Sequence, residues 1–538
     1  MAAQKNTNRI GLGLILAAAF LLRLVGLGSS ELLFDEALYS FRSIGWLDYL
    51  ESSVQTTPIQ WLADSNLPGW QKLSFHDHPP LFFLIQRMFF GVSGDSLLAS
   101  RLPSAIFGVA FVYLIYLVAR KLFASDAPGL FAALTAAVSL AHVSVSRLAM
   151  MESVLFFFVL LNIHCFLKLL DGQKHWLMFG LTLGLAFLTK YIAILLIPTY
   201  LVFLTVHRRD VLKNSKLYLA LIVSVLIFSP VIIYNIYSYK TFGHFDLQFA
   251  YLLNQKTPWP VDGFGGKTQD PFSKIGENLT SVFSWPFLAI SLAGLILIFW
   301  KKELRKRLSL ILISFLFITL LLTRTGSAIR FVSLYVMPFS FLAAAIFLFL
   351  WDKKPKVTGA ILAIFVVHEL FFTAKTVFLN PPDYGVAKLD KYLDSVFMGG
   401  RSKAIPTHPN PYLDKIIQKY AAETPVKLTQ PTGIIYDDDL ATGPMLWLFS
   451  RRQYYHAIPI MKSSQFQEMT ENKTIGQLKN FDLYFVKTET ASPVNPIRAT
   501  DYAEQIEELL TADGQKPVEI IKNGSAETAF KVYKFSVQ

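Results

Sequence analysis

Long apolar blocks recur through most of this chain, and they constrain its fold more than any other feature. They run for roughly 16 to 22 residues, the length that an α-helix needs to cross a bilayer. They are solidly apolar, whereas the strands of an outer-membrane barrel alternate apolar with polar residues. Only 16% of the residues are charged, against about 25% in soluble domains. The pattern excludes a soluble enzyme, a disordered chain and a fibrous protein, and it predicts an α-helical polytopic membrane protein.

About eleven blocks qualify as membrane spans. The first lacks an A-x-A cleavage site and is followed by further spans, so we interpret it as an uncleaved helix instead of a signal peptide. The predicted spans are residues 10–28, 99–119, 128–145, 153–170, 175–189, 192–206, 217–237, 283–300, 308–323, 331–351 and 357–378.

The positions of Lys and Arg predict how these spans are oriented. The loops at 207–216, 301–307 and 352–356 hold four, five and three basic residues, whereas the loop at 29–98 holds three against eight acidic ones. Because basic residues gather in cytoplasmic loops, we expect the N-terminus inside and the C-terminal region outside, in a multi-pass protein of the cell membrane. The net charge of +12 fits this bias and does not require a nucleic-acid partner.

One apolar stretch, residues 79–92, is too short to be a span. Its 14 residues rise only about 21 Å as a helix, and Gln86 and Arg87 lie in its middle. We expect an interfacial or re-entrant helix within the first outer loop, residues 29–98.

The composition changes after residue 379. Short β-like runs at 433–437, 482–487 and 530–537 alternate with polar helical stretches such as 502–512. The sequence therefore predicts a transmembrane domain over 1–379 and an extracytoplasmic α/β domain over 380–538. The single cysteine, Cys165, excludes a disulfide framework and any metal site built from cysteines.

Acidic and histidine residues of the first outer loop are candidates for chemistry. Asp35 and Glu36 follow the first span directly, where a carboxylate acts as a general base, binds a metal or cationic group, or simply begins an interfacial helix. The segment from His76 to Pro80 opens the interfacial helix. Two His flanking an Asp support a divalent metal only weakly, because an isolated H-x-H pair is a common pattern.

Several cations lie at the predicted outer ends of the spans, although the charge rule favours the inner side. One reading is snorkelling to lipid headgroups. We favour the other reading, a phosphate site, since three separate turns contribute. The candidates are Arg147 with Glu152, Lys190, and Arg324 with Arg330. By contrast, Asp437 to Asp439, after a β-like run, read better as a solvated acidic turn than as a ligand site.

The chain contains no Walker motif, no G-x-G-x-x-G after a strand and no H-E-x-x-H. An enzyme at the outer face therefore needs a donor that arrives through the lipid, and a lipid-linked phosphosugar meets this requirement.

A set of short motifs, taken in order, resembles a known family. They are DE at 35–36, HPPL at 78–81, RLPSAIFG at 101–108, R-x-x-M-x-E at 147–152, GLAFLTKY at 184–191 and R-F-x-x-x-Y-x-x-P at 330–338. Over residues 1–350 the chain resembles the GT-C integral-membrane glycosyltransferases of the protein O-mannosyltransferase and aminoarabinose transferase type, glycosyltransferase families 39 and 83.

The resemblance implies transfer, with inversion, of a hexose or pentose from a polyprenyl- or dolichyl-phosphate sugar to a protein, lipid or glycan at the outer face. No metal is required. Asp35 looks like the catalytic carboxylate and Glu36 its helper in acceptor binding. His78, Pro79 and Pro80 match the motif that shapes the active site, where Glu152 replaces the usual Asp. Lys190 and Arg330 match positions that meet the lipid phosphate.

Two rivals stay open. One is a non-catalytic transporter of lipids or sugars, which the absence of an internal repeat disfavours. The other is an oligosaccharyltransferase or polymer-extending enzyme on a similar scaffold.

Overall fold

The computed structural model describes residues 2–32, 34–45, 69–75, 77–94, 96–256, 272–397, 400–408, 411–428, 430–489 and 500–537. These residues form two compact units. The first unit holds residues 2–27 and 69–380, and the second holds residues 28–45 and 381–537.

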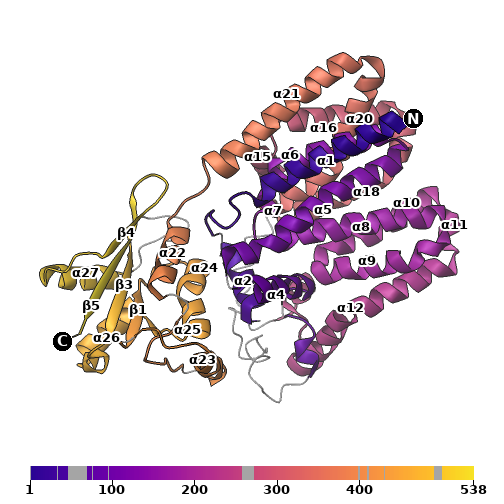
Figure 1. Ribbon diagram of the computed structural model, residues 1–538. Coiled ribbons are helices and arrows are strands. Elements are labelled where there is room, and N and C mark those ends of the chain that lie inside the picture. Colours follow the sequence, from indigo (N-terminus) through magenta and orange to yellow (C-terminus); the bar gives the residue numbers. More distant parts are fainter. Residues whose placement is uncertain are drawn as a thin grey trace. The chain divides into compact units, whose positions relative to one another are not determined.

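The first unit is a bundle of helices, most of which run side by side (Figure 1). Its described elements are α1 (Ala2–Leu24), η1 (Gly69–Lys72), α4 (Leu81–Ser93), α5 (Leu97–Phe123), α6 (Asp126–Val138), α7 (Leu140–Ser146), α8 (Met151–Asp171), η2 (Gln173–His175), α9 (Trp176–Thr189), η3 (Tyr191–Leu195), α10 (Leu196–His207), α11 (Arg209–Leu212), α12 (Ser215–Phe242), α13 (Leu247–Leu252), α15 (Phe272–Val282), α16 (Trp285–Trp300), α17 (Lys302–Arg307), α18 (Ser309–Thr325), α19 (Ile329–Val332), η4 (Ser333–Tyr335), α20 (Val336–Lys353), α21 (Pro355–Ala374) and η5 (Lys375–Leu379).

Six helices of the described part are long and apolar enough to cross a membrane, and up to eight if each of two bent pairs is one span. The bent pairs are α6 with α7, at 61°, and residues 274–282 with α16, at 114°. Three further apolar helices, α9, the segment 191–207 and α18, are shorter. Each of the eleven expected spans coincides with one of these helices, while the number that crosses a membrane stays a prediction.

The break between α6 and α7 is stabilised by side chains from other helices. Arg23 of α1 donates to the carbonyls of Ala136 and Ala137 at 3.4 and 3.1 Å. The hydroxyl of Thr373 donates to the carbonyl of Val138 at 2.8 Å. A helix that ends inside an apolar bundle leaves carbonyls without intrahelical partners, which is unfavourable unless side chains supply donors. The bend between α6 and α7 is therefore stabilised by hydrogen bonds from neighbouring helices.

Close packing of α9 on α12 sets the position of the chain that follows α9. Gly180 and Gly184 face α12, and a Cβ at these positions would lie 2.4 Å from the carbonyl oxygen of Ala220 and 2.9 Å from that of Ser224. Small residues allow such an approach between apolar helices. Lys190 follows α9 directly, so this packing helps to determine where it lies.

The expected short helix at 79–92 is α4. Its fully buried Gln86 donates to the carbonyl of Ser100 in α5 at 2.8 Å, whereas Met88 and Val92 are 70% and 88% exposed. This amphipathic pattern is consistent with the interfacial helix predicted from the sequence, whose depth in a membrane stays a prediction.

The second unit is a small α/β unit around a five-stranded sheet of order β2-β1-β3-β5-β4. Strand β1 is parallel to β2 and β3, while β5 is antiparallel to β3 and β4. Its described elements are α2 (Phe34–Gly45), α22 (Val386–Phe397), α23 (Pro411–Glu423), β1 (Thr432–Tyr436), α24 (Thr442–Met445), η6 (Leu446–Ser450), α25 (Arg451–His456), β2 (Ile460–Lys462), α26 (Ser463–Glu471), η7 (Ile475–Leu478), β3 (Asp482–Thr488), α27 (Tyr502–Ala512), β4 (Glu519–Lys522) and β5 (Thr528–Ser536).

The three strands expected from the sequence are β1, β3 and β5, and the expected helix at 502–512 is α27. Ile435, Phe485 and Tyr533 of these strands pack with Phe466 of α26 and Ile506 of α27 in one buried cluster. The prediction of an α/β fold for this region is confirmed. Strands β2 and β4 were missed because they are only three and four residues long and half of their side chains or more are partly exposed.

The structure differs from the expected domain division in the first outer loop, because residues 28–45 belong to the second unit. Both oxygens of the buried Glu31 carboxylate accept backbone N–H groups at the start of α22, from Tyr384, Val386 and Ala387 at 2.7 to 3.1 Å. A carboxylate at a helix N-terminus satisfies donors that have no intrahelical partner. These bonds join residue 31 to a segment more than 350 residues later.

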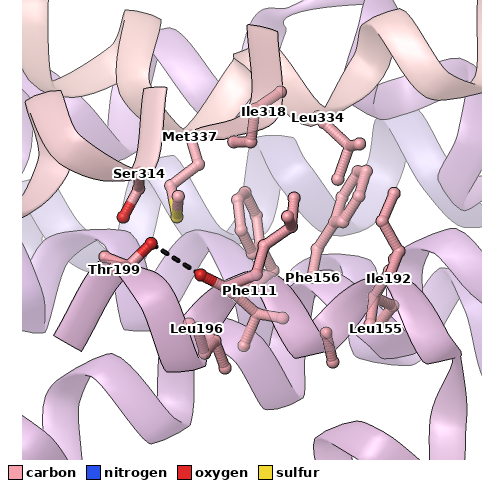
Figure 2. Close-up of a pocket in the computed structure, with 13 residues that line it drawn as sticks. Phe111, Leu155, Phe156, Ile192, Leu196, Thr199, Ser314, Ile318, Leu334 and Met337 are labelled. Atoms are coloured by element: carbon pink, nitrogen blue, oxygen red, sulfur yellow. Dashed lines mark hydrogen bonds between the residues drawn. The ribbon is translucent and has the colours of Figure 1, made fainter. Parts of the chain in front are cut away.

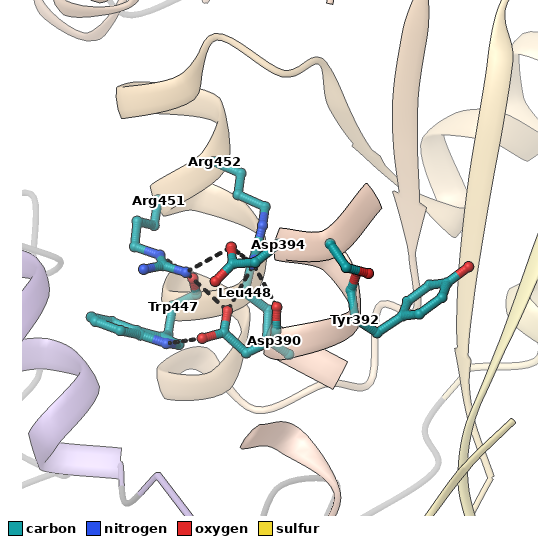
Figure 3. Close-up of polar contacts among 8 residues, drawn as sticks. Asp390, Tyr392, Asp394, Trp447, Leu448, Arg451 and Arg452 are labelled. Atoms are coloured by element: carbon teal, nitrogen blue, oxygen red, sulfur yellow. Dashed lines mark hydrogen bonds and ion pairs between the residues drawn. The ribbon is translucent and has the colours of Figure 1, made fainter. Parts of the chain in front are cut away.

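A buried ion network holds α22 to η6 and α25 (Figure 3). One oxygen of Asp390 accepts from Arg451 and Arg452 at 2.9 Å each, and the other accepts from the indole N–H of Trp447 at 3.0 Å. Burial favours a higher pKa for Asp390, but the two guanidiniums outweigh it and lower that pKa below its ordinary value. Asp390 is therefore ionised in the folded protein.

Candidate active site

Three breaks between helices of the first unit bring charged side chains together. Glu152 lies in the first turn of α8, where an acidic residue is favoured. Lys190 lies between α9 and η3 in an extended conformation, and Arg330 lies in the short helix α19. We call Glu152, Lys190 and Arg330 the charged trio.

The charged trio is compact and mostly buried. The Lys190 Nζ lies 2.6 Å from Glu152 Oε1, and the two side chains are 14% and 3% exposed. Both cations make cation–π contacts with the ring of Phe331, with Lys190 Nζ at 5.2 Å and Arg330 Cζ at 4.9 Å from its centroid. Arg330 is also close enough to Glu152 to act on it electrostatically. Among the described residues, the second oxygen of Glu152 has no hydrogen-bond donor.

An apolar cavity of about 50 Å³ lies among α5, α8, η3, α10, α18, η4 and α20 (Figure 2). Its wall residues Leu155, Ile192 and Leu334 follow the three members of the trio by three, two and four residues. The hydroxyl of Thr199 in this wall is satisfied by the carbonyl of Leu195 at 2.7 Å, so its polarity does not face the cavity unpaired. Charge and apolar surface thus adjoin within about one helical turn.

Such an arrangement suits an amphipathic anion. The trio holds two cations, and Lys and Arg are the side chains that bind phosphoryl oxygens. The free oxygen of Glu152 can accept a hydrogen bond from a hydroxyl group. The cavity offers apolar surface for a hydrocarbon chain next to the anion.

Arg147 lies elsewhere and is engaged with backbone. Its guanidinium donates to the carbonyls of Leu22, Val25 and Gly26 at 2.8 to 3.2 Å, at the C-terminal end of α1. A cation there satisfies the last carbonyls of the helix and complements its dipole. The structure thus gives Arg147 a structural role, and its assignment to a donor phosphate stays a prediction. Arg324 lies in the last turn of α18, and its side chain lies outside the described residues.

The H-D-H-P-P segment leads into α4. His78 Nδ1 lies 2.8 Å from Asp77 Oδ2, and the two prolines, Pro79 and Pro80, are buried before the helix begins. His76 lies outside the described residues. Within the described ranges, no group of three or more His, Cys, Asp or Glu side chains is placed to hold a metal ion.

The remaining acidic candidates lie in the second unit. Asp35 and Glu36 occupy the first turn of α2, with Asp35 partly exposed and Glu36 fully buried. Their catalytic roles stay predictions.

The acidic run after β1 is bound within its own unit. Asp437 accepts from the backbone and hydroxyl of Thr488, and Asp438 accepts from the backbone and hydroxyl of Ser464. Asp439 accepts from the backbone of Thr500. The preferred reading of a solvated turn needs correction, because these carboxylates tie loops together.

Two members of this region were missed by the sequence analysis. Phe331 follows Arg330 within a motif that we quoted, yet an aromatic residue in an apolar chain gives no signal of its own. Asp246 contacts Tyr191, the neighbour of Lys190, at 2.5 Å. Its position after Gly243, at the start of a short helix, was the available signal for a helix cap.

Known proteins resemble this chain in sequence and in fold. Residues 77–234 match the family of dolichyl-phosphate-mannose-protein mannosyltransferases. The chain is 32% identical over 142 residues to a Bacillus subtilis (strain 168) protein named "Putative mannosyltransferase YycA", and the match spans 26% of this chain and 21% of that protein. About a fifth of this relative is therefore represented.

Solved structures share the fold over nearly the whole chain. ArnT from Cupriavidus metallidurans, in the apo state, matches with a TM-score of 0.58 at 12% identity, over 99% of this chain and 98% of that one. The archaeal oligosaccharyltransferase AglB from Archaeoglobus fulgidus matches with a TM-score of 0.51 at 13% identity, over 90% and 70%. The resemblance inferred from the motifs is thus confirmed as a likeness: residues 77–234 are similar to the mannosyltransferase family, and the chain shares the fold of ArnT and AglB.

Proposed function

We propose that this protein is an inverting glycosyltransferase that moves a hexose or pentose from a polyprenyl-phosphate donor to a protein, lipid or glycan at the outer face of the cell membrane. The observation that carries the proposal is the charged trio beside an apolar cavity. A lipid-linked phosphosugar has these two properties in the same order, an anionic phosphate joined to a long hydrocarbon chain.

Two proteins of the same fold support this choice of donor. One solved structure is ArnT from Cupriavidus metallidurans bound to undecaprenyl phosphate, and the AglB structure is a complex with an inhibitory peptide and a dolichol-phosphate. Both ligands are phosphates on isoprenoid chains.

The proposed reaction is a single displacement. Asp35 takes the proton of the acceptor hydroxyl, whose oxygen forms a bond to the anomeric carbon of the sugar. The bond from that carbon to the phosphate oxygen breaks, and the phosphate leaves with the electron pair. Lys190 and Arg330 stabilise the negative charge that grows on the leaving phosphate. No metal is needed for this balance.

A direct test uses detergent-purified protein with radiolabelled polyprenyl-phosphate sugars and a membrane extract as acceptor. We expect label to move from the lipid to an acceptor of the extract, with release of the polyprenyl monophosphate. Mass spectrometry of outer-surface glycans and lipids, with and without the protein, then identifies the product.

The rivals predict other outcomes of the same assay. An oligosaccharyltransferase, favoured by the likeness to AglB, would transfer a preassembled oligosaccharide and ignore single lipid-linked sugars. A transporter would move the labelled lipid across a vesicle bilayer without breaking the bond between sugar and phosphate. Either result would overturn the proposed reaction.

A further inference from the structure

Asp246 lies outside the charged trio, yet it binds the residue next to Lys190. It is fully buried between α12 and α13. Its Oδ2 accepts from the hydroxyl of Tyr191 at 2.5 Å and from the amide of Asn235 at 3.1 Å, while its Oδ1 accepts from the backbone of Phe249 at 3.1 Å. Its own N–H donates to the amide oxygen of Asn235 at 2.8 Å.

Helix capping accounts for only half of this arrangement. The bond from Phe249 to Oδ1 caps α13, a helix of six residues, and needs one oxygen. The other oxygen, Oδ2, accepts hydrogen bonds from Tyr191 of η3 and from Asn235 of α12. Tyr191 is further held by its ring, which packs on that of Phe249 with centroids 4.7 Å apart. Asp246 therefore ties η3 to the end of α12.

The anchored residue is adjacent to Lys190 in the chain. Lys190 has an extended backbone, with φ −162° and ψ 139°, so consecutive side chains leave on opposite sides. The Lys190 side chain points to Glu152 on α8, and the Tyr191 side chain points to Asp246. Because a lysine has a long flexible stem, a fixed backbone on one side and a carboxylate on the other are what hold its ammonium in place.

We infer that Asp246 is a positioning residue, which acts through Tyr191 to hold Lys190 where it meets the anionic group of the substrate. This inference rests on the proposed function, and it adds a residue to which no motif of the sequence points.

Protonation of Asp246 is the means of testing the inference. Burial raises the pKa of Asp246 to about 6, against hydrogen bonds from Tyr191 and Asn235 that lower it, and the Asp77 carboxylate raises it further. The other titratable groups near the network are Tyr234, beside Tyr191, and His244, two residues before Asp246. A proton on Asp246 removes acceptor capacity from a carboxyl group that receives three donors.

The sign of the pH effect separates positioning from stability. Because the pKa is raised on folding, the folded state binds the proton more tightly, and this group stabilises the fold more at low pH than above its pKa. Positioning requires the ionised form, so it is lost as the pH falls through about 6. Protonation of Asp246 stabilises the fold, so a loss of phosphate binding at low pH is not explained by unfolding that Asp246 causes.

The experiment measures binding of undecaprenyl phosphate to the full-length protein in detergent, between pH 5 and 8. We expect Asp246→Asn to weaken binding about tenfold at pH 7.5 and to remove the protein's own contribution to the pH profile. Tyr191→Phe deletes the hydrogen bond through which Asp246 acts, so it should weaken binding to a similar extent and also remove the protein's own contribution to the pH profile. The phosphate also titrates near pH 6, but equally for every variant, so differences between variants are the readout.

Tyr200→Phe is the matched control. Tyr200 is also buried, and its hydroxyl donates to Asn162 at 2.7 Å. It lies about three helical turns after Lys190 along the chain. We expect Tyr200→Phe to lower thermal stability without changing the affinity for undecaprenyl phosphate or its pH dependence. If Tyr191→Phe behaves like Tyr200→Phe, Asp246 is a structural cap and the inference is wrong. If the unmodified protein fails to bind the probe, the proposed donor is wrong, and the inference falls with it.

Discussion

Lys190 and Arg330 share the ring of Phe331 although they come from distant parts of the chain, and this fits a clamp on a phosphate. We expect Lys190→Ala or Arg330→Ala to weaken donor binding and to slow transfer, since charge on the leaving phosphate grows in the transition state. A charge-assisted contact contributes roughly 1.5–3 kcal/mol, or about 10- to 150-fold in affinity. Lys190→Arg or Arg330→Lys should restore only part of the donor affinity and transfer rate.

Two control variants guard this measurement. Lys353 lies 4.2 Å from the ring centroid of Phe349, a similar cation–aromatic contact remote from the site, so Lys353→Ala should leave donor affinity and turnover unchanged. Removing Lys190 alone leaves Glu152 buried without its cation, so the double variant Lys190→Met with Glu152→Gln tests binding without that penalty. Normal affinity and turnover in all variants would mean that these cations only meet lipid headgroups.

Asp35 is the partly exposed member of the pair in α2, and exposure allows contact with an acceptor. We expect Asp35→Asn to reduce transfer by about 10²- to 10⁴-fold while donor binding persists, because the change removes the base and keeps the size. Single-turnover kinetics with prebound donor measure the chemical step. Near-normal turnover would reassign the base to Glu36 or Glu152.

Among the elements, α22 is attached to α25 by two carboxylates, of which Asp390 is the more buried and pairs with both guanidiniums. We expect Asp390→Asn to destabilise the second unit by about 3–5 kcal/mol, because two buried guanidiniums lose their counter-charge. Asp394 lies one turn further along α22 and also contacts Arg452, at 2.6 Å, but its side chain is 63% exposed. Asp394→Asn is therefore a matched control, with an expected loss below about 1 kcal/mol. Hydrogen exchange of η6 and α25 amides in the full-length protein measures both.

The same carboxylate predicts a pH dependence. The pKa of Asp390 in the folded state is below its ordinary value of 3.8, so its stabilisation is present above pH 3.8 and is lost as the pH falls through the lower, folded value. Asp390→Asn should therefore remove this acid-sensitive part of the protection. Equal loss of protection in acid, with and without the substitution, would contradict this account.

For the whole molecule, the bias of basic loops predicts that the second unit lies outside the cell membrane. A reporter that works only in the cytoplasm, fused after residue 380, should give no signal, and one fused after residue 354 should give a strong one. The second fusion controls for expression. A strong signal from the first fusion would reverse the orientation and remove the reason for a lipid-linked donor.

Much of the architecture followed from local chemistry. Solid apolar blocks specify helices wherever they occur, because a backbone in hydrocarbon has to satisfy its own hydrogen bonds. The strands β1, β3 and β5 were visible because their apolar runs are long enough to signal burial. The short strands β2 and β4 have too few residues for such a signal, and they form only because neighbouring strands offer hydrogen bonds.

The sequence alone determined that this chain is a helical membrane protein with a C-terminal α/β unit, and its motifs singled out Glu152, Lys190 and Arg330. Only the tertiary structure decided which of the cations meet. Arg147 was as good a candidate as Lys190 by sequence, but α1 supplies carbonyls that engage it, and no local pattern reveals a partner about 120 residues away. Asp246 was invisible for the same reason, because its function depends on Tyr191, whose hydroxyl reaches it only once α9 and α12 are packed together.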